Sequence, residues 1–426
     1  MREPARLLSA ALCALAFSAM AAEPPDAPND ELDALTLADQ APDAPAAAAQ
    51  RWRAYLEGAG FSRRLGADPD AKAAGRASLD ARFDGTLTPG LRLVLSDRLD
   101  LMRDNADPAI DSVNTVREAY LSWSVSDSQT LDLGRVNVRH GAAMGYNPTD
   151  WFKTGALRGV VSPDPAALRE NRQGTVVLQG QQLWPAGGLT LTLSPRLERV
   201  RDDDTFAFDA GATNARNRWL LAGSLKIAEG WTPEVLLHGA EGSSPQLGFN
   251  LSTLAGDAVV VYGEATFGKG PSLVDQALQT GGRDRMQRRA SLGLTYTTPF
   301  NLSLTVEAQY ASAAPDRSQW NALPSIAAAA PLQLLSVAGD LQDLPARRGA
   351  FVYATWKDAF VRRLDLSAFV RQELETDSRE QWLELRHRWD RFDLAAQVLV
   401  HSGDAGSVYR SIPQRRSLEL SLRYYL

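Results

Sequence analysis

The last twelve residues, Arg415–Leu426, read RRSLELSLRYYL and decide the fold. Leu418, Leu420 and Leu422 share one parity of this stretch, whereas charged and polar residues take the other parity. A β-strand with that pattern has one apolar and one polar face, because successive side chains point to opposite sides. An apolar strand at the end of a chain invites aggregation in water unless both of its edges are paired. The stretch therefore predicts the closing strand of a barrel whose outer face meets lipid.

This ending also resembles the closing strand of Gram-negative outer-membrane barrels. In that class, alternate apolar residues lead to an aromatic residue third from the end and to a second aromatic residue at the end. Tyr424 fits the pattern, whereas Leu426 stands where Phe or Trp is usual. The resemblance implies location in the outer membrane of a Gram-negative cell after secretion across the inner membrane. It also implies contact with outer-membrane lipid and lipopolysaccharide.

The N-terminal segment has the composition of a cleaved secretory signal. Two arginines precede the apolar run 7–17, and Ala19-Met20-Ala21 supplies an A-x-A cleavage site. The segment that follows is rich in Ala, Pro and Asp, which predicts a disordered spacer or, alternatively, a docking peptide for a periplasmic or outer-membrane partner protein. The predicted domains are a signal peptide (1–21), a flexible periplasmic leader (22–51) and an outer-membrane β-barrel (52–426).

Composition excludes several classes of site. Cys13 is the only cysteine and lies inside the predicted signal, so disulfides, thiolate metal sites and cysteine nucleophiles are not expected. The net charge is −6, whereas nucleic-acid binding calls for a basic balance. No two histidines have helical metal spacing, and no phosphate-binding or dinucleotide motif stands between a strand and a helix. We therefore expect neither a metal nor a cofactor.

From residue 52 onward the chain alternates apolar and polar residues in runs of about 10 to 12 residues, the length that a tilted strand needs to cross a bilayer. The even count of 18 runs returns the C-terminus to the side of the N-terminus. We predict an all-β fold, a single transmembrane antiparallel up-and-down β-barrel of about 18 strands. A soluble sandwich or propeller is the alternative, and the run lengths and missing blade-length repeat count against it. The predicted strands are 52–62, 76–87, 91–102, 113–126, 129–140, 173–183, 189–200, 216–228, 231–241, 246–253, 257–267, 288–298, 301–311, 348–358, 363–373, 379–389, 391–402 and 415–426.

Tight turns alternate with longer segments along these runs, as periplasmic turns alternate with external loops in such barrels. Aromatic residues gather near the tight turns, which predicts an aromatic girdle at one membrane interface. These residues are Trp123, Trp184, Trp231, Tyr296, Phe300, Phe360, Trp389, Phe392 and Tyr424.

The predicted inner face carries charges of both signs with a modest basic surplus, including Arg82, Arg98 and Arg386. Such a surplus would raise the local concentration of anionic solutes in a hydrated lumen. Alternatively, the charges pair across the wall and only support the barrel.

The most distinctive segment, 133–172, reads LGRVNVRHGAAMGYNPTDWFKTGALRGVVSPDPAALRENR. Its glycines and Asn147-Pro148 permit sharp turns, which predicts a loop that folds into the lumen and narrows it; an external loop without solute contact is the alternative. The segment resembles porin-like barrels in which a Gly-Arg strand precedes a Gly-bounded loop, including the alginate-export group. That resemblance implies passage of an anionic sugar polymer or a small anion. Candidate contacts in this segment are Arg135, Asn137 and Arg139, taken as inward-facing strand residues, and Arg158, Arg169 and Arg172.

These sequence patterns are compatible with three functions. A passive channel for an anionic solute or glycan, with a basic constriction, is the first. A structural or assembly barrel, plugged by loops or by a partner, is the second. The apolar loop 312–348 is a plug, a contact for a partner or a packed cap on the barrel mouth. An enzyme is the third, but His401 and Ser402 are neighbours in a strand and face opposite sides, so a Ser/His site is not expected there.

Overall fold

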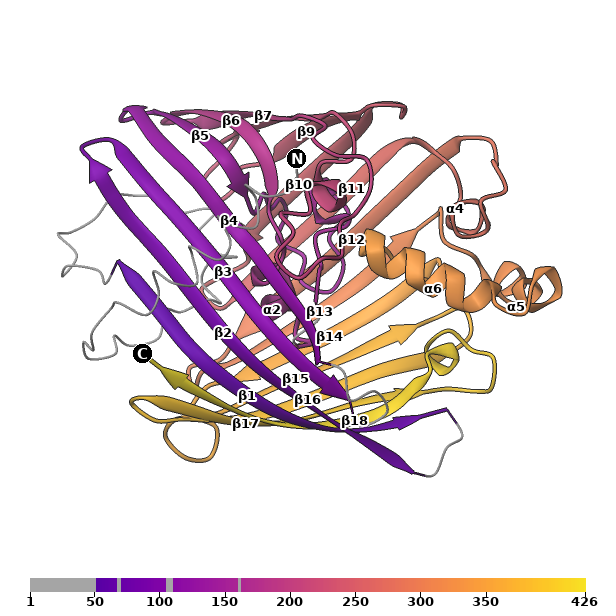
Figure 1. Ribbon diagram of the computed structural model, residues 1–426. Helices are drawn as coiled ribbons and strands as arrows, with labels where there is room; N and C mark the ends of the chain where they lie inside the picture. The colour runs from indigo at the N-terminus through magenta and orange to yellow at the C-terminus, as the bar shows by residue number, and fades with distance from the viewer. Residues whose placement is uncertain (1–50, 67–69, 105–109, 160–161) are drawn as a thin grey trace.

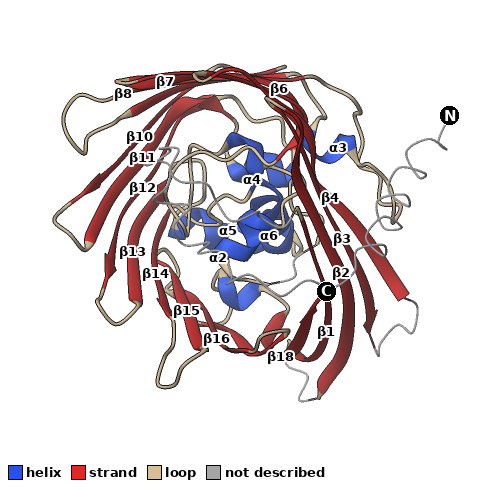
Figure 2. Ribbon diagram, turned by 90° about the vertical axis from the view of Figure 1, so that its left-hand side faces the viewer, coloured by secondary structure: helices blue, strands red, loops and turns tan. Residues whose placement is uncertain are grey.

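The computed structural model describes residues 51–66, 70–104, 110–159 and 162–426. The predicted signal peptide and nearly all of the predicted leader lie outside the described residues. Eighteen strands form one closed antiparallel sheet, as predicted (Figures 1 and 2). Among the described residues, no helix has the length and apolar character needed to cross a membrane.

The strands follow one another around the barrel in chain order. They are β1 (Trp52–Leu65), β2 (Ala71–Thr88), β3 (Leu91–Asp104), β4 (Ile110–Ser126), β5 (Gln129–Val136), β6 (Thr175–Trp184), β7 (Gly187–Ser194), β8 (Arg218–Leu225), β9 (Glu234–Ala240), β10 (Gln246–Leu254), β11 (Val259–Gly270), β12 (Arg285–Thr297), β13 (Leu302–Ala311), β14 (Arg348–Trp356), β15 (Leu364–Glu373), β16 (Ser378–Arg388), β17 (Phe392–Ser402) and β18 (Gln414–Tyr425). The described helices are η2 (Trp151–Lys153), α2 (Pro165–Glu170), α3 (Ala210–Thr213), α4 (Leu273–Leu278), α5 (Arg317–Ile326), α6 (Ala330–Leu341) and η3 (Tyr409–Ser411).

The last strand closes the barrel, as its pattern predicts. β18 pairs with β17 on one side and with β1 on the other, joining the two ends of the sheet. Leu418, Leu420 and Leu422 are 45%, 56% and 49% exposed on the outer face. Glu419 and Arg423 point inward, where they bind Arg76 and Glu57, respectively. The predicted assignment of these side chains to the two faces is therefore confirmed.

The predicted fifth strand ends too late. β5 stops at Val136 and not at residue 140. The alternation of apolar residues continues to Val138, which lies beyond the end of the strand. Val138 packs inside the barrel with Phe152, Leu220 and Leu236. β5 to β9 have 8, 10, 8, 8 and 7 residues. The pairing of β8 with β9 continues beyond these bounds, through the bridge between Ala228 and Trp231 at one end and the bond from Glu241 N–H to the Asn217 carbonyl at the other. β1 to β4 have 14, 18, 14 and 17 residues.

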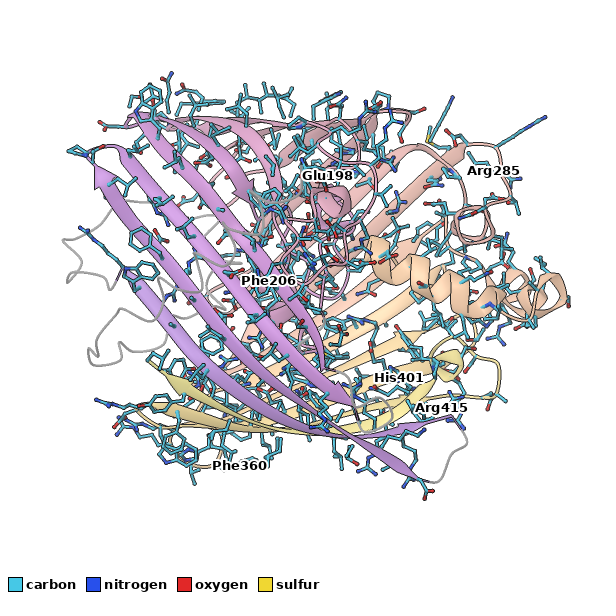
Figure 3. The ribbon with its side chains drawn as sticks, in the orientation of Figure 1. Glu198, Phe206, Arg285, Phe360, His401 and Arg415 are labelled. Atoms are coloured by element: carbon cyan, nitrogen blue, oxygen red, sulfur yellow. The ribbon has the colours of Figure 1, made fainter. Side chains whose placement is uncertain are left out.

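The segment 195–217 closes the wall above the end of β5. The backbone N–H of Asn114 in β4 donates to the carbonyl of Thr205 at 3.0 Å, where β5 would otherwise continue. The N–H of Gly174 donates to the carbonyl of Arg117 at 2.8 Å. Phe206 of the segment lies beside β4 (Figure 3). These bonds satisfy the backbone groups that the short β5 leaves on the edge of β4.

Aromatic side chains project outward at the end of the barrel that holds the tight turns. Trp123 is 52% exposed, Trp184 42%, Trp231 45% and Phe360 74%. Phe360 and the rim arginines Arg285 and Arg415 lie at opposite ends of the barrel (Figure 3). The outer face thus has the aromatic band expected at a membrane interface.

The loop 312–348 folds into a packed cap. Trp320, Leu323 and Leu334 of α5 and α6 are fully buried against Leu273 of α4 and Val408. Figure 2 shows α4, α5 and α6 within the outline of the strands. This apolar cluster explains how so apolar a loop remains folded at the barrel mouth.

Candidate functional site: a loop folded across the lumen

The segment between β5 and β6 crosses the lumen and is held by two wall carboxylates. Glu307 of β13 accepts hydrogen bonds from the backbone N–H groups of Met144 at 2.5 Å, Gly145 at 3.1 Å and Tyr146 at 3.2 Å. Glu264 of β11 accepts from the N–H of Ala143 at 2.6 Å. A carboxyl group that accepts hydrogen bonds from several backbone N–H groups fixes that backbone strongly. The segment therefore folds inward and is anchored to the wall.

Two glycines make this close approach possible. A Cβ atom at Gly141, where φ is +81°, would stand 2.4 Å from the Glu264 carboxylate. A Cβ at Gly145 would stand 2.4 Å from the ring of Phe351. Only glycine fits the backbone against these side chains.

Aromatic contacts hold the loop at both sides of the lumen. Trp151 stacks on His238 of β9 with ring centroids 5.0 Å apart, and its indole N–H donates to Gln246 at 2.6 Å. Met144 packs against the aromatic cluster that Phe351 forms with other inner residues of β14 to β16. The loop is thus fixed to β9 and β10 on one side and to β14 on the other.

The α2 end of the loop rests on the same wall as Met144. The hydroxyl of Tyr353 in β14 donates to Asp164, the N-cap residue of α2, at 3.0 Å. Burial raises the pKa of the Asp164 carboxyl to about 6, although the Tyr353 hydrogen bond opposes the shift.

The loop is also tied to the cap. The Tyr146 hydroxyl donates to Asp343 at 2.6 Å, and Arg172 donates to Gln342 at 2.9 Å. Gln342 in turn donates to the carbonyl of Lys153 at 2.7 Å. Burial lowers the pKa of the Lys153 amine to about 8, and nearby Asp343 limits that shift. Loop and cap therefore form one connected body over the lumen.

Most of the loop residues that were predicted to contact a solute instead bind other groups of the protein. Arg169 donates to the carbonyl of Gly141 at 3.0 Å, and Asn137 donates to the carbonyl of Arg169 at 2.9 Å. Arg172 forms an ion pair with buried Asp150 at 2.5 Å. Arg158 binds the carbonyl of Ala207 at 2.8 Å and so holds the segment 195–217.

Arg135 does not face the lumen, contrary to the prediction. It shares its parity with Leu131 and Leu133, which are 37% and 59% exposed on the outer face. Its guanidinium donates to the carbonyl of Phe208 at 2.6 Å and stacks on the Phe208 ring at 3.8 Å. The charge is tolerated at an outward position because the segment 195–217 covers it.

Arg139 is the predicted contact that remains open to solvent. It lies between Val138 and His140, which contact the inner wall, and it is itself exposed. Within the part of the chain that the structure describes, Arg139 has no hydrogen-bond or ion-pair partner. His140 approaches Glu234 of β9 at 3.6 Å. Burial alone would lower the pKa of His140, but the Glu234 carboxylate raises it above its usual value.

The predicted arginines of the wall are paired. Arg98 is 3% exposed and binds Glu57 at 3.0 Å. Arg82 binds Glu118 at 2.6 Å, and Arg386 binds Glu384 at 2.9 Å. Arg82 and Arg386 nevertheless keep 28% and 21% of their side chains exposed.

The inner wall holds more charges than predicted. A register shift in the β3–β4 ladder beside Ser96 and Asp97 lets both Arg117 and Glu118 reach inner partners. Such a bulge cannot be read from alternation. The inner charges that the prediction missed are Glu57, Arg76, Arg117, Asp132, Glu264, Asp365, Glu380 and Asp393. Most of them are acidic, so the basic surplus predicted for the wall is not present.

A hydrolase site does not form at His401. Its two ring nitrogens lie 2.6 Å from the carbonyl of Gln414 and 3.3 Å from Glu380. Both nitrogens are therefore occupied, and neither is left to activate a serine hydroxyl.

No family model matches the sequence, and no curated protein matches it. Solved structures do resemble its fold. OccK5 (OpdH) of Pseudomonas aeruginosa has 10% sequence identity and a TM-score of 0.54, and the match covers 88% of this chain and 98% of that chain. OccAB1 of Acinetobacter baumannii has 8% identity and a TM-score of 0.56, with 88% and 97% covered. The outer membrane protein OprD from Pseudomonas aeruginosa has 12% identity and a TM-score of 0.52, with 88% and 92% covered.

These similarities concern the fold, because the identities are low. They do not support the resemblance to the alginate-export group. The closed sheet of 18 antiparallel strands, the outward aromatic band and the matching structures lead to one conclusion. The chain has the fold of a porin-like 18-strand β-barrel, similar to the Occ and OprD structures.

Proposed function

We propose that this protein is a porin-like channel of the Gram-negative outer membrane and passes a small anionic solute passively. The observation that carries the proposal is the loop held across the lumen by Glu264 and Glu307. A wide barrel becomes selective when an anchored segment narrows it, because the solute must then pass within reach of fixed charges. The resemblance to an outer membrane protein supports the location.

The preference for anions rests on the arginines that remain open to solvent. Arg139 is exposed and unpaired among the described residues, whereas Arg371 and Arg423, whose side chains are 23% and 26% exposed, are ion-paired with Glu380 and Glu57. Exposed guanidinium groups in a narrow, low-dielectric passage raise the local concentration of anions. The anchored loop and the cap favour a small solute over a polymer, because both occupy the mouth.

Planar-bilayer recording tests the proposal. We expect single-channel conductance with a reversal potential that indicates anion preference in a salt gradient. Arg139→Ser should lower the anion-to-cation permeability ratio roughly two-fold. Arg64→Ser is the matched control, since Arg64 is exposed on the outward parity of β1, and it should leave the ratio unchanged. Cation preference in the native protein, or equal effects of the two variants, would contradict the proposed selectivity.

A structural barrel with a closed lumen is the second candidate. The buried cluster of α4, α5 and α6 favours it, because a cap with a packed apolar core does not move aside easily. Silent bilayers together with a stoichiometric partner in purified outer membranes would support this function instead.

A further inference from the structure

Two arginines from opposite ends of the chain face each other on the outer wall. Arg64, near the end of β1, and Arg416, near the start of β18, are direct cross-strand partners. Both are exposed at outward positions, since they share the parity of lipid-facing Leu56 and Leu418. Neither guanidinium has a hydrogen-bond or ion-pair partner in the part of the chain that the structure describes. Like charges directly opposite each other destabilise a sheet, so an anion bound between them would stabilise this pair.

The arginine pair lies where the apolar outer face ends. Apart from this pair, the outward positions of β17, β18, β1 and β2 carry no charged residue along their described lengths. Arg416 lies eight residues before Tyr424, which is 43% exposed. A rise of about 3.3 Å per residue and a tilt of about 40° place it roughly 20 Å from Tyr424 along the membrane normal. Its chain neighbour Arg415 lies at the end of the barrel opposite Phe360 (Figure 3). The long side chains therefore reach the headgroup layer on the side of the external loops.

The wall below Arg64 leaves room for an apolar chain. The outward residues of β1 there are small, and a Cβ at Gly58 or Gly60 would meet nothing within 4 Å. Each of these small residues lies opposite an exposed leucine of β18. A hydrocarbon chain that lies along β1 would contact these leucines while its headgroup stays level with the arginines. The pairs are Ser62–Leu418, Gly60–Leu420 and Gly58–Leu422.

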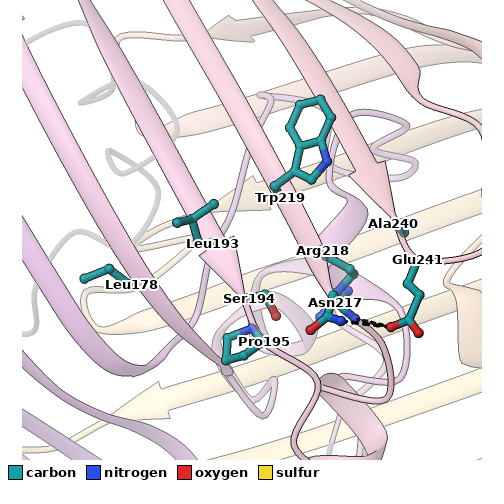
Figure 4. A pocket seen from close by; sticks show the side chains of 9 residues that line it. All are labelled: Leu178, Leu193, Ser194, Pro195, Asn217, Arg218, Trp219, Ala240 and Glu241. Atoms are coloured by element: carbon teal, nitrogen blue, oxygen red, sulfur yellow. Dashed lines mark hydrogen bonds between the residues drawn. The ribbon is translucent and has the colours of Figure 1, made fainter.

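A hollow elsewhere on the same rim lacks this charge. A cavity of about 720 Å³ opens on the outer face between Leu193 and Trp219 (Figure 4). Beside it, Arg196 is ion-paired with Glu241 at 2.6 Å, and Asn217 donates to Glu241 at 3.0 Å. The protein itself supplies the anion there. The facing arginines on β1 and β18 have no such acid among the described residues.

We propose that Arg64 and Arg416 together bind a phosphate group of an outer-leaflet lipid. A guanidinium presents paired N–H donors that match two phosphate oxygens, so two facing arginines can hold one phosphate from both sides. In a Gram-negative outer membrane the phosphorylated lipid of that leaflet is lipopolysaccharide, through its lipid A portion. Binding replaces the repulsion between β1 and β18 with two attractions and so stabilises the contact that closes the barrel. The inference rests on the membrane location proposed above.

Titration with lipid A, followed by native mass spectrometry of the protein in detergent, tests the site. The double variant Arg64→Gln, Arg416→Gln removes both guanidinium groups. Arg196→Gln, Arg216→Gln is the matched control, because it removes the same charge from exposed arginines at the same rim. We expect diphosphoryl lipid A to bind the native chain and the control alike, and the first variant about tenfold more weakly. Lipid A without its phosphates should bind all three proteins equally weakly.

Thermal unfolding in detergent gives a second readout. Without lipid, Arg416→Gln should raise the unfolding midpoint, because it removes the repulsion with Arg64. Adding diphosphoryl lipid A should raise the midpoint of the native chain but not that of the variant. The mobility of unheated samples on SDS gels reports barrel folding separately.

Equal affinity of the native chain for lipid A with and without phosphates would overturn the inference, even if the double variant does not fold. Equal weakening in the two double variants would also overturn it. Displacement of lipid A by millimolar inorganic phosphate would indicate a site for a free anion instead of a lipid. A chain that does not float with lipid vesicles would overturn both the location and this inference, whereas the other outcomes leave the location standing.

Discussion

Replacing Glu307 with Ala should release the loop from β13. The carboxylate is 1% exposed and accepts the backbone N–H groups of Met144, Gly145 and Tyr146. In the variant these three groups lose their acceptor in a buried site. Because the strands pair through their backbones, the barrel itself should stay closed.

The size of the effect follows from the three lost bonds. A buried donor left without a partner costs about 1–3 kcal/mol, and water entering the lumen recovers part of that cost. Taking the lower end for each N–H gives about 3 kcal/mol for local opening of the loop. That energy corresponds to roughly a hundredfold faster exchange of these amides, since each 1.4 kcal/mol is about tenfold.

Hydrogen exchange measured by mass spectrometry on peptides covering 141–150 gives the direct readout. Glu307→Gln should lie between the native protein and the Ala variant, because it keeps one acceptor oxygen. Glu419→Ala is the control, since Glu419 binds Arg76 in the wall and has no bond to the loop. Unchanged protection of 141–150 in Glu307→Ala would refute the reasoning that this carboxylate anchors the loop.

Three further outcomes are expected. Gly145→Ala should displace the loop and increase current noise in bilayers, because its Cβ would stand 2.4 Å from an aromatic ring, whereas Gly159→Ala, with open space around its Cβ, should not. Arg135→Ala should increase trypsin cleavage within 195–217 without changing ion selectivity, and uncut protein would count against its role in holding that segment. The pKa of Asp164 is about 6 in the folded protein against an ordinary 3.8, so the folded state holds an extra proton between these values. Amide protection of α2, corrected for intrinsic exchange, should therefore increase as pH falls from about 6 towards 3.8, and Asp164→Asn should abolish that dependence.

The architecture could be predicted because one physical rule repeats in every strand. Inner and outer side chains alternate, so the 18 strands and the closure of β18 on β1 follow from sequence periodicity. The late end assigned to β5 shows the limit of that rule. Val138 continues the apolar alternation, but it packs on the inner wall as part of the loop.

The alternation in the sequence is sufficient to place Arg135 on the outer face. It follows Leu131 and Leu133 at the same parity, which places it outside, although a charge there contradicts the expectation of a lipid-facing surface. The segment 195–217 resolves the conflict by covering the guanidinium. The position of this segment depends on contacts with residues far away in the sequence, and no local sequence pattern predicts it.

The loop anchors show the same limit. Glu307 could be placed in the lumen from its parity, but its partners Met144, Gly145 and Tyr146 lie more than 160 residues earlier. A single sequence assigns a side chain to a face, whereas the pairing across the lumen depends on how the closed barrel brings distant faces together. The arginines likewise could be counted, but their partners could not be assigned.

The ion pairs around Glu57 bear on how the barrel closes during folding. Glu57 of β1 binds Arg76 of β2 and Arg98 of β3, all near the start of the chain, and also Arg423 of β18. The last of these bonds can form only when the final strand reaches the first one. An unfinished sheet would thus leave Glu57 without its bond to Arg423 and Arg76 without its bond to Glu419 of the same final strand. Arrival of β18 supplies both partners at once, so these ion pairs favour the pairing that closes the barrel over pairing of the open edge with another strand.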